Sequence, residues 1–82
     1  MRILWDEPKR LANLAKHGFD FGGLTLDFFA VAQVRPVREG RLQAVGMLRG
    51  RPVTVIFLPL GSEGLSVVSM RTSSIRERML LK

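Results

Sequence analysis

Hydrophobic and polar side chains recur at helical spacing near the start of the chain, between Trp5 and Gly18. Successive helical residues lie about 100° apart, so the polar residues of this stretch fall within an arc of about 120°. This polar side consists of Asp6, Lys9, Arg10, Asn13, Lys16 and His17. The opposite side consists of Leu11, Ala12, Leu14 and Ala15. The pattern predicts an amphipathic helix that turns its leucines and alanines toward the core.

Residues at both ends of this stretch are typical of helix boundaries. Asp6 is the expected N-cap, because its carboxylate can accept hydrogen bonds from the free backbone N–H groups of the first turn. Pro8 is tolerated in that turn, where no intrahelical donor is needed. Gly18 can adopt the left-handed conformation that ends a helix. These signals predict the position of the first helix closely.

From Ala30 onward the hydrophobic period changes to two, which is typical of strands. Residues 30–38 predict an irregular edge strand, because Pro36 cannot donate a hydrogen bond to a central ladder. Residues 41–49 alternate strictly between two faces. One face carries Leu42, Ala44, Gly46 and Leu48, and the other carries Arg41, Gln43, Val45, Met47 and Arg49. This alternation predicts a half-exposed strand.

A continuous apolar run at residues 53–58 predicts a strand covered on both sides, at the centre of the sheet. Residues 65–71 predict the last strand, and residues 1–4 suit a brief first strand. The connections between residues 41 and 71 are short, which implies antiparallel neighbours. We therefore expect an antiparallel meander in this part of the chain.

Two further helices are expected. The segment 19–29 can start a second helix with Asp20 as its N-cap, although two glycines within it disfavour a helix. Near the C-terminus, Ser74 and Glu77 have the spacing of a capping box, in which each side chain bonds the other's backbone N–H. The fold class is α+β, with N-terminal helices packed on the meander and a C-terminal helix. Residues 1–82 are expected to form a single domain.

Composition limits the chemistry that the chain can support. The sequence has 82 residues, no cysteine and one histidine, so a thiolate metal site or a disulfide framework is excluded and a zinc centre is not expected. We expect no metal and no cofactor. No apolar run approaches the roughly 18 residues that span a membrane. We expect a soluble protein of the cytoplasm that does not bind membranes.

Positive charge is concentrated in the second half of the chain. Residues 1–34 carry as many basic as acidic side chains, whereas residues 35–82 carry nine basic and three acidic ones and hold the entire net charge of +6. A surplus of this sign attracts phosphate backbones or an acidic protein surface. An arginine-rich soluble surface without a dedicated ligand is the alternative.

Several spaced motifs resemble those of one known family. They are Trp5-Asp6-Glu7, Lys9, Asn13, Lys16-His17-Gly18, Gly50-Arg51, Val68-Ser69-Met70-Arg71 and Glu77-Arg78. In order and spacing they resemble the BrnT family of bacterial toxins over nearly the whole chain. The resemblance implies a RelE-like ribonuclease toxin that blocks translation by cutting RNA. It also implies a co-encoded, DNA-binding BrnA-type antitoxin that neutralises the toxin in a hetero-oligomer.

Two positions depart from the pattern of the family. Met70 stands where the family usually has alanine, and Leu81 stands where a tyrosine is common; the chain contains no tyrosine. If the side chain of that tyrosine contributes to RNA cleavage in the family, this protein cleaves RNA weakly or uses another group in its place. The alternative to a nuclease is therefore a catalytically weak or inactive basic module that binds a partner protein.

Metal-free cleavage of RNA requires a proton acceptor, a proton donor and positive charge at the phosphorus. Histidine is the one side chain whose unperturbed pKa lies near neutrality, which makes His17 a candidate for proton transfer, with Lys16 beside it. Its alternative role is to bond the carbonyl groups at the helix end. Arg71 and Ser69 share a strand face and are candidates for contact with the phosphate. The alternative for Arg71 is a salt bridge to Asp6, Glu7 or Glu77.

Four further basic residues are candidates for binding RNA or phosphate: Lys9, Arg51, Arg76 and Arg78. The three arginines also fit a solvated surface, and Lys9, like Lys16, also fits a contact with the antitoxin. A third functional class is a DNA-binding regulator that reads the major groove with the first helix. The carboxylates of Asp6 and Glu7 in its first turn would repel phosphates, which disfavours this class.

Overall fold

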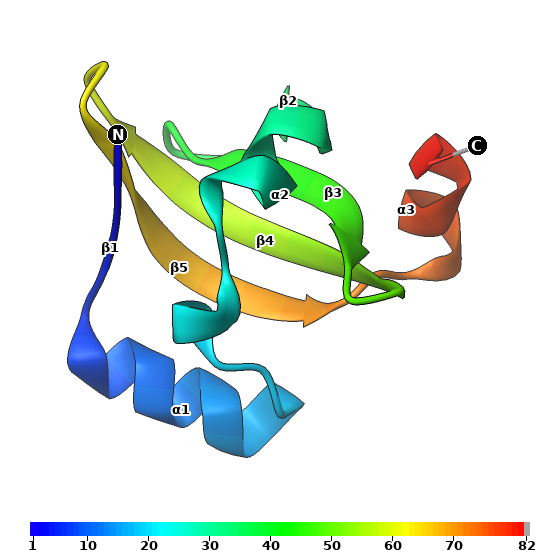
Figure 1. The fold of residues 1–82 in the computed structure, drawn as a ribbon, viewed down its shortest axis with the longest axis horizontal. Helices are drawn as coiled ribbons and strands as arrows, with labels where there is room; N and C mark the ends of the chain where they lie inside the picture. Colours follow the sequence, from blue (N-terminus) through cyan, green and yellow to red (C-terminus); the bar gives the residue numbers. More distant parts are fainter. Residues whose placement is uncertain (82) are drawn as a thin grey trace.

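A five-stranded sheet with the order β1-β5-β4-β3-β2 organises the fold (Figure 1). We describe it from a computed structural model of the chain, which describes residues 1–81. The strands are β1 (Arg2–Trp5), β2 (Gln33–Pro36), β3 (Leu42–Leu48), β4 (Arg51–Leu60) and β5 (Gly64–Thr72). The helices are α1 (Glu7–His17), α2 (Leu26–Val31) and α3 (Ile75–Arg78), with short 3-10 turns η1 (Phe21–Gly23) and η2 (Met79–Leu81). The predicted α+β class is confirmed.

Strand β4 lies at the centre of the sheet, as the apolar run predicted. Val53, Thr54 and Val55 are each 0% exposed, so both faces are covered in the first half of the strand, whereas Ile56 and Leu58 are only partly buried. Strands β3, β4 and β5 pair antiparallel through the two short turns. Strand β1 is the exception, because it pairs parallel to β5, along Gly64 to Val67. The sheet is therefore mixed and extends the antiparallel meander by one strand at its edge.

The main core lies between the sheet and the segment that contains η1 and α2, which crosses one face of the sheet (Figure 1). Its buried members are Phe21, Leu24, Phe28, Ala44, Val53, Val55, Phe57, Leu65, Val67 and Met70. The helix α2 approaches β3 closely at Gly46, where an added Cβ would lie 3.0 Å from Cε1 of Phe28. The glycine thus permits the close packing of α2 on the sheet.

The other face of β3 is also covered, so the prediction of a half-exposed strand is wrong at its centre. Gln43 is 6% exposed and Val45 is 0% exposed, although both belong to the face that was expected to contact solvent. The reason is the C-terminal helix: the carboxylate of Glu77 in α3 accepts a hydrogen bond from the side chain of Gln43 at 3.1 Å. The helix α3 therefore covers part of the face of the sheet opposite α2, at Gln43 and Thr54.

The boundaries of α1 agree with the prediction, but one detail of its cap does not. Asp6 occupies the N-cap position without a side-chain cap hydrogen bond. An N-cap carboxylate accepts from the second or third residue of a helix, and the second is Pro8, which has no N–H. Gly18 ends the helix with φ 76°, in the left-handed conformation that was predicted.

The predicted orientation of α1 is wrong. Asn13 is its only buried residue, whereas Leu11 is 53% exposed and Leu14 is 38% exposed. Helical periodicity separates a polar from an apolar side, but it does not say which side meets the rest of the protein. Here the neighbour of α1 is the edge of a strand, whose backbone groups require polar partners.

The expected helix over residues 19–29 is interrupted. Asp20 does act as an N-cap, since its carboxylate accepts from the backbone N–H of Gly22, but only for the 3-10 turn η1. The helix α2 begins later, with Thr25 as its N-cap. It continues to Val31, so the edge strand β2 begins at Gln33 rather than at residue 30. Within residues 1–81, no helix is long and apolar enough to cross a membrane.

Candidate active site

Helix α1 lies alongside the part of β5 that β1 leaves unpaired (Figure 1). The side chain of Asn13 accepts a hydrogen bond from the backbone N–H of Met70 at 3.0 Å and donates one to the backbone oxygen of Met70 at 2.9 Å. Its amide nitrogen also donates to the backbone oxygen of Phe19 at 3.2 Å. Asn13 therefore takes the place of a neighbouring strand and fixes the polar side of α1 against β5.

A hollow of about 260 Å³ opens between α1 and β5, which we call the α1–β5 hollow. Its lining consists of Lys9, Ala12, Asn13, Lys16, His17, Val68 and Ser69. Residues four and seven positions apart share one side of a helix, so Lys9, Asn13 and Lys16 reach the same space. The structure thus brings together four of the predicted site residues: Lys9, Lys16, His17 and Ser69.

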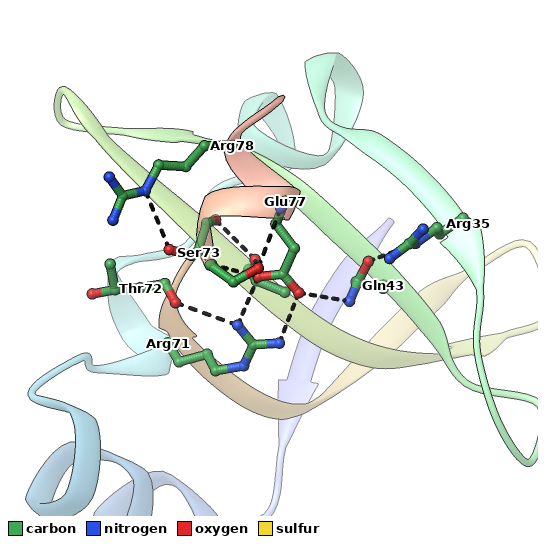
Figure 2. Close-up of polar contacts among 9 residues, drawn as sticks. Arg35, Gln43, Arg71, Thr72, Ser73, Glu77 and Arg78 are labelled. Atoms are coloured by element: carbon green, nitrogen blue, oxygen red, sulfur yellow. Dashed lines mark hydrogen bonds and ion pairs between the residues drawn. The ribbon is translucent and has the colours of Figure 1, made fainter. Parts of the chain in front are cut away.

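Arg71 follows Ser69 by two positions on β5. The described residues that line the α1–β5 hollow do not include Arg71. Its guanidinium forms a bidentate ion pair with Glu77, at 2.7 Å from Nη1 to Oε1 and 2.8 Å from Nη2 to Oε2 (Figure 2). Nη1 also donates to the backbone oxygen of Thr72 at 3.3 Å. The alternative in which Arg71 pairs with Glu77 is therefore confirmed as a contact.

Glu77 is the centre of a buried polar network between α3 and the sheet (Figure 2). Besides Arg71, its carboxylate accepts hydrogen bonds from the side chains of Gln43 and Thr54 and from the backbone N–H of Ser74. The hydroxyl oxygen of Ser74 in turn accepts a hydrogen bond from the backbone N–H of Glu77, so the predicted capping box is confirmed. The hydrogen bond from Arg71 is the main reason that the pKa of Glu77 is lowered to about 2.

The same contact raises the pKa of Arg71, because the protonated guanidinium is the form that binds Glu77. The carboxylate largely compensates the positive charge of Arg71 in this position. A guanidinium has five N–H donors, and the hydrogen bonds of Arg71 to Glu77 and Thr72 use three of them. With 36% of its side chain exposed, Arg71 keeps donors for a ligand but offers it little net charge.

The three remaining arginine candidates lie apart from the α1–β5 hollow. Arg51 begins β4, and its guanidinium carbon lies 5.0 Å from the ring centroid of Phe19. Arg78 donates from Nε to the backbone oxygen of Ser73 at 3.3 Å, and Arg76 is exposed on α3. Of the four predicted phosphate-binding residues, only Lys9 lines the hollow.

Asn13 and Glu77 are the residues whose importance the sequence reasoning underestimated. Asn13 was placed among the polar residues of α1 without a role, and Glu77 was assigned a capping function and named as one of three possible partners of Arg71. A single asparagine between two lysines on one helix face is a weak signal, since surface helices carry such residues without partners. No three histidine, aspartate or glutamate side chains within residues 1–81 are grouped so that they could hold a metal ion.

Comparisons with known proteins agree with this architecture. The family described as "Ribonuclease toxin, BrnT, of type II toxin-antitoxin system" matches residues 5–77. The crystal structure of the Brucella abortus ribonuclease toxin BrnT is 53% identical, with a TM-score of 0.86; the match covers 90% of this chain and 97% of that chain. A comparison with curated protein sequences found no match.

The fold and the family match together define a ribonuclease toxin of a type II toxin–antitoxin system. Within this class, the chain belongs to the BrnT family, as the resemblance in its motifs indicated.

Proposed function

We propose that this toxin cuts RNA without a metal ion, at the α1–β5 hollow, with the 2′-hydroxyl of the substrate as the nucleophile. The observation that carries the proposal is the convergence of Lys9, Lys16 and His17 with Ser69 on one hollow. A hollow that combines two ammonium groups, an imidazole and a hydroxyl suits a phosphodiester, because it supplies positive charge, proton transfer and a neutral donor.

Each side chain has a defined task in this reaction. His17 accepts the proton of the 2′-hydroxyl, whose oxygen attacks the phosphorus and forms a 2′,3′-cyclic phosphate. The bond to the 5′-oxygen breaks, and this oxygen takes a proton from the water that reaches the exposed side chains. Lys16 and the hydroxyl of Ser69 stabilise the additional negative charge on the phosphoryl oxygens. Lys9, one turn or more away on α1, holds a neighbouring phosphate.

Arg71 enters the proposal as a second phosphate contact, through the donors that Glu77 and Thr72 leave free. Arg51, Arg76 and Arg78 extend the basic surface along which the RNA backbone lies. The fold is taken as RelE-like, because helices precede a run of three antiparallel strands. The cellular consequence is inhibition of translation in the cytoplasm.

The partner that we propose is a co-encoded antitoxin of the DNA-binding BrnA type, which neutralises the toxin in a hetero-oligomer. The net charge of +6 favours a partner with an acidic surface. The same charge attracts RNA, so an antitoxin that covers the α1–β5 hollow would compete with the substrate.

The test is cleavage of a labelled RNA at neutral pH in the presence of a metal chelator. The wild type is expected to release a product that ends in a 2′,3′-cyclic phosphate, and His17→Gln is expected to lose at least about 100-fold in rate. Leu11→Ala is the control, since Leu11 is 53% exposed on the same helix. An unchanged cleavage rate in His17→Gln would remove this residue from proton transfer.

A catalytically weak protein-binding module is the second candidate. Two observations favour it: the chain contains no tyrosine, and the charge of Arg71 is compensated by Glu77. In the same assay, a wild type that cuts no RNA but binds its antitoxin tightly would support this candidate over the nuclease.

A further inference from the structure

A second hollow of about 260 Å³ lies between the end of α1 and the β3–β4 hairpin, and we call it the hairpin hollow. Its apolar walls come from Leu14, Phe19, Leu48 and Met70, and two arginines, Arg49 and Arg51, also line it. Met70 and Ser69 are consecutive on β5, so their side chains point to opposite faces, and they line the hairpin hollow and the α1–β5 hollow respectively. The two hollows therefore lie on opposite sides of the contact between α1 and β5, and they approach each other around the end of α1, where His17 lines the α1–β5 hollow and the next residue, Gly18, lines the hairpin hollow.

Arg49 occupies a backbone conformation that arginine rarely adopts. Leu48 and Arg51 pair across the hairpin, and the two residues between them have φ of 51° for Arg49 and 79° for Gly50. Positive φ at both positions is the mark of a type I′ turn, where asparagine, aspartate or glycine is strongly preferred first. A strained residue in such a place is a reason to look for a function. Arg49 is placed for such a function, because its side chain lines the hairpin hollow and its guanidinium nitrogens lie 3.8 and 3.9 Å from the position that a Cβ on Gly23 would occupy.

Arg51 presents a flat cationic surface in the same space. Its guanidinium stacks over the ring of Phe19, at 5.0 Å from the centroid. Nucleic-acid bases commonly stack on the plane of an arginine side chain, and a guanidinium that is held on one side by an aromatic ring is already oriented for such contact.

The charges around the hairpin hollow favour an anionic ligand. Neither Arg49 nor Arg51 forms an ion pair with a carboxylate within residues 1–81. Asp20 is the one acidic residue in the lining, and its two oxygens are engaged by Nη1 of Arg10 at 3.0 Å and by the backbone N–H of Gly22 at 2.8 Å. The arginines thus remain available, while the carboxylate is already satisfied.

We propose that the hairpin hollow binds one nucleotide of the RNA substrate, beside the nucleotide that is cut in the α1–β5 hollow. The base enters between the apolar walls and stacks on Arg51, and Arg49 binds the adjoining phosphate. This subsite sets the base preference next to the cleaved bond. The inference rests on the proposed function, because it takes RNA as the substrate.

The test measures the binding of short 2′-O-methyl RNA, in which the nucleophile is blocked, so that cleavage does not enter the result. The variants are Arg49→Asn, which keeps a residue suited to the turn, and Arg51→Ala. Arg51→Ala is expected to weaken binding about 5- to 100-fold, the range for one stacked base, and Arg49→Asn is expected to weaken it through the lost contact with the adjoining phosphate. Arg38→Ala is the control, because Arg38 is an exposed arginine in the loop at the other end of β3 and its removal changes the net charge equally.

A second oligonucleotide identifies the base as the ligand. With an RNA that has one abasic position next to the cleavage site, Arg51→Ala is expected to lose no more affinity than Arg38→Ala does, because the stacking contact is absent and only the change in net charge remains. Equal binding of intact RNA by the wild type and both variants would overturn the proposal. An equal loss in Arg38→Ala would also overturn it, since the effect would then come from net charge alone.

These outcomes separate this inference from the proposed function. If the wild type cuts no RNA but the binding results are as expected, the subsite stands and the proposed catalytic role fails. If the wild type cuts RNA and the two variants bind and cut all sequences as the wild type does, only the subsite fails.

Discussion

The substitution Asn13→Ala tests how α1 is attached to the sheet. It removes the hydrogen bonds from Asn13 to the backbone N–H and oxygen of Met70 and to the backbone oxygen of Phe19. A typical hydrogen bond contributes about 1 kcal/mol to stability, and more when its loss leaves a buried group without a partner. Met70 is 1% exposed, so we expect Asn13→Ala to lower the free energy of unfolding by about 2–4 kcal/mol.

This loss is large for a chain of this size. At roughly 0.05–0.15 kcal/mol per residue, the total stability of a small domain is about 4–12 kcal/mol. Leu11→Ala on the same helix provides the contrast. Burial of Leu11, as its periodicity predicts, would make that substitution cost about 2–5 kcal/mol. In the structure Leu11 is 53% exposed, so we expect less than about 0.5 kcal/mol.

Urea denaturation, followed by the fluorescence of Trp5, measures both variants. Trp5 is the only tryptophan of the chain. Its fluorescence reports on the packing beside α1, because its ring packs edge to face against the ring of Phe21, with 6.5 Å between the two ring centroids. Free energies follow from the midpoints and slopes by linear extrapolation. A larger loss in Leu11→Ala than in Asn13→Ala would refute the observed orientation of α1 and restore the one that periodicity predicted.

Three further predictions concern the buried network and the core. The pKa of Glu77 is lowered from 4.5 to about 2, chiefly by the hydrogen bond from Arg71; between these values the unfolded chain binds the proton more readily. Stability should therefore fall as the pH decreases from about 4.5 toward 2, and Glu77→Gln should remove part of this fall in urea midpoints measured across that range. An equally steep fall in Glu77→Gln would contradict the assignment. Arg71→Ala leaves the buried carboxylate of Glu77 without its cation and should lower the free energy of unfolding by about 1–3 kcal/mol. The double variant Arg71→Ala/Glu77→Gln should lose less than the sum of the two single losses. Additive losses would show that Arg71 and Glu77 are not coupled. Gly46→Ala places a Cβ 3.0 Å from Cε1 of Phe28 and should lower stability by about 1–3 kcal/mol through overpacking, whereas an unchanged melting temperature would show that α2 can shift without cost.

The Arg71 prediction also affects how toxicity assays should be interpreted. Loss of growth arrest in Arg71→Ala has two physical causes, a missing phosphate contact or a less stable fold. The variant Arg71→Lys keeps a positive charge beside Glu77 but loses the planar, bidentate geometry. Measured stability of both variants next to RNA cleavage separates the two causes.

Much of the candidate site could be predicted from helical spacing. Lys9, Lys16 and His17 lie on one side of α1 because of their positions in the sequence, and this is a local property of the chain. That Ser69 lies opposite them was not predictable in the same way, since it depends on how α1 packs beside β5. The ion pair between Arg71 and Glu77 was one of several alternatives for that arginine, and only the position of α3 selected it.

The sequence by itself determined the local structure: the bounds of α1, the central position of β4 and the capping box of Ser74 and Glu77. These features depend on hydrogen bonds and hydrophobic spacing within short segments. The tertiary structure alone decided which side of α1 faces the sheet. Strand β1 is shorter than β5, so part of an edge of β5 lacks a neighbouring strand, and its backbone groups require polar partners. Asn13 provides such partners to the backbone N–H and oxygen of Met70. These hydrogen bonds contribute more to stability than burial of Leu11 and Leu14 would, and they place the basic side of α1 at the α1–β5 hollow.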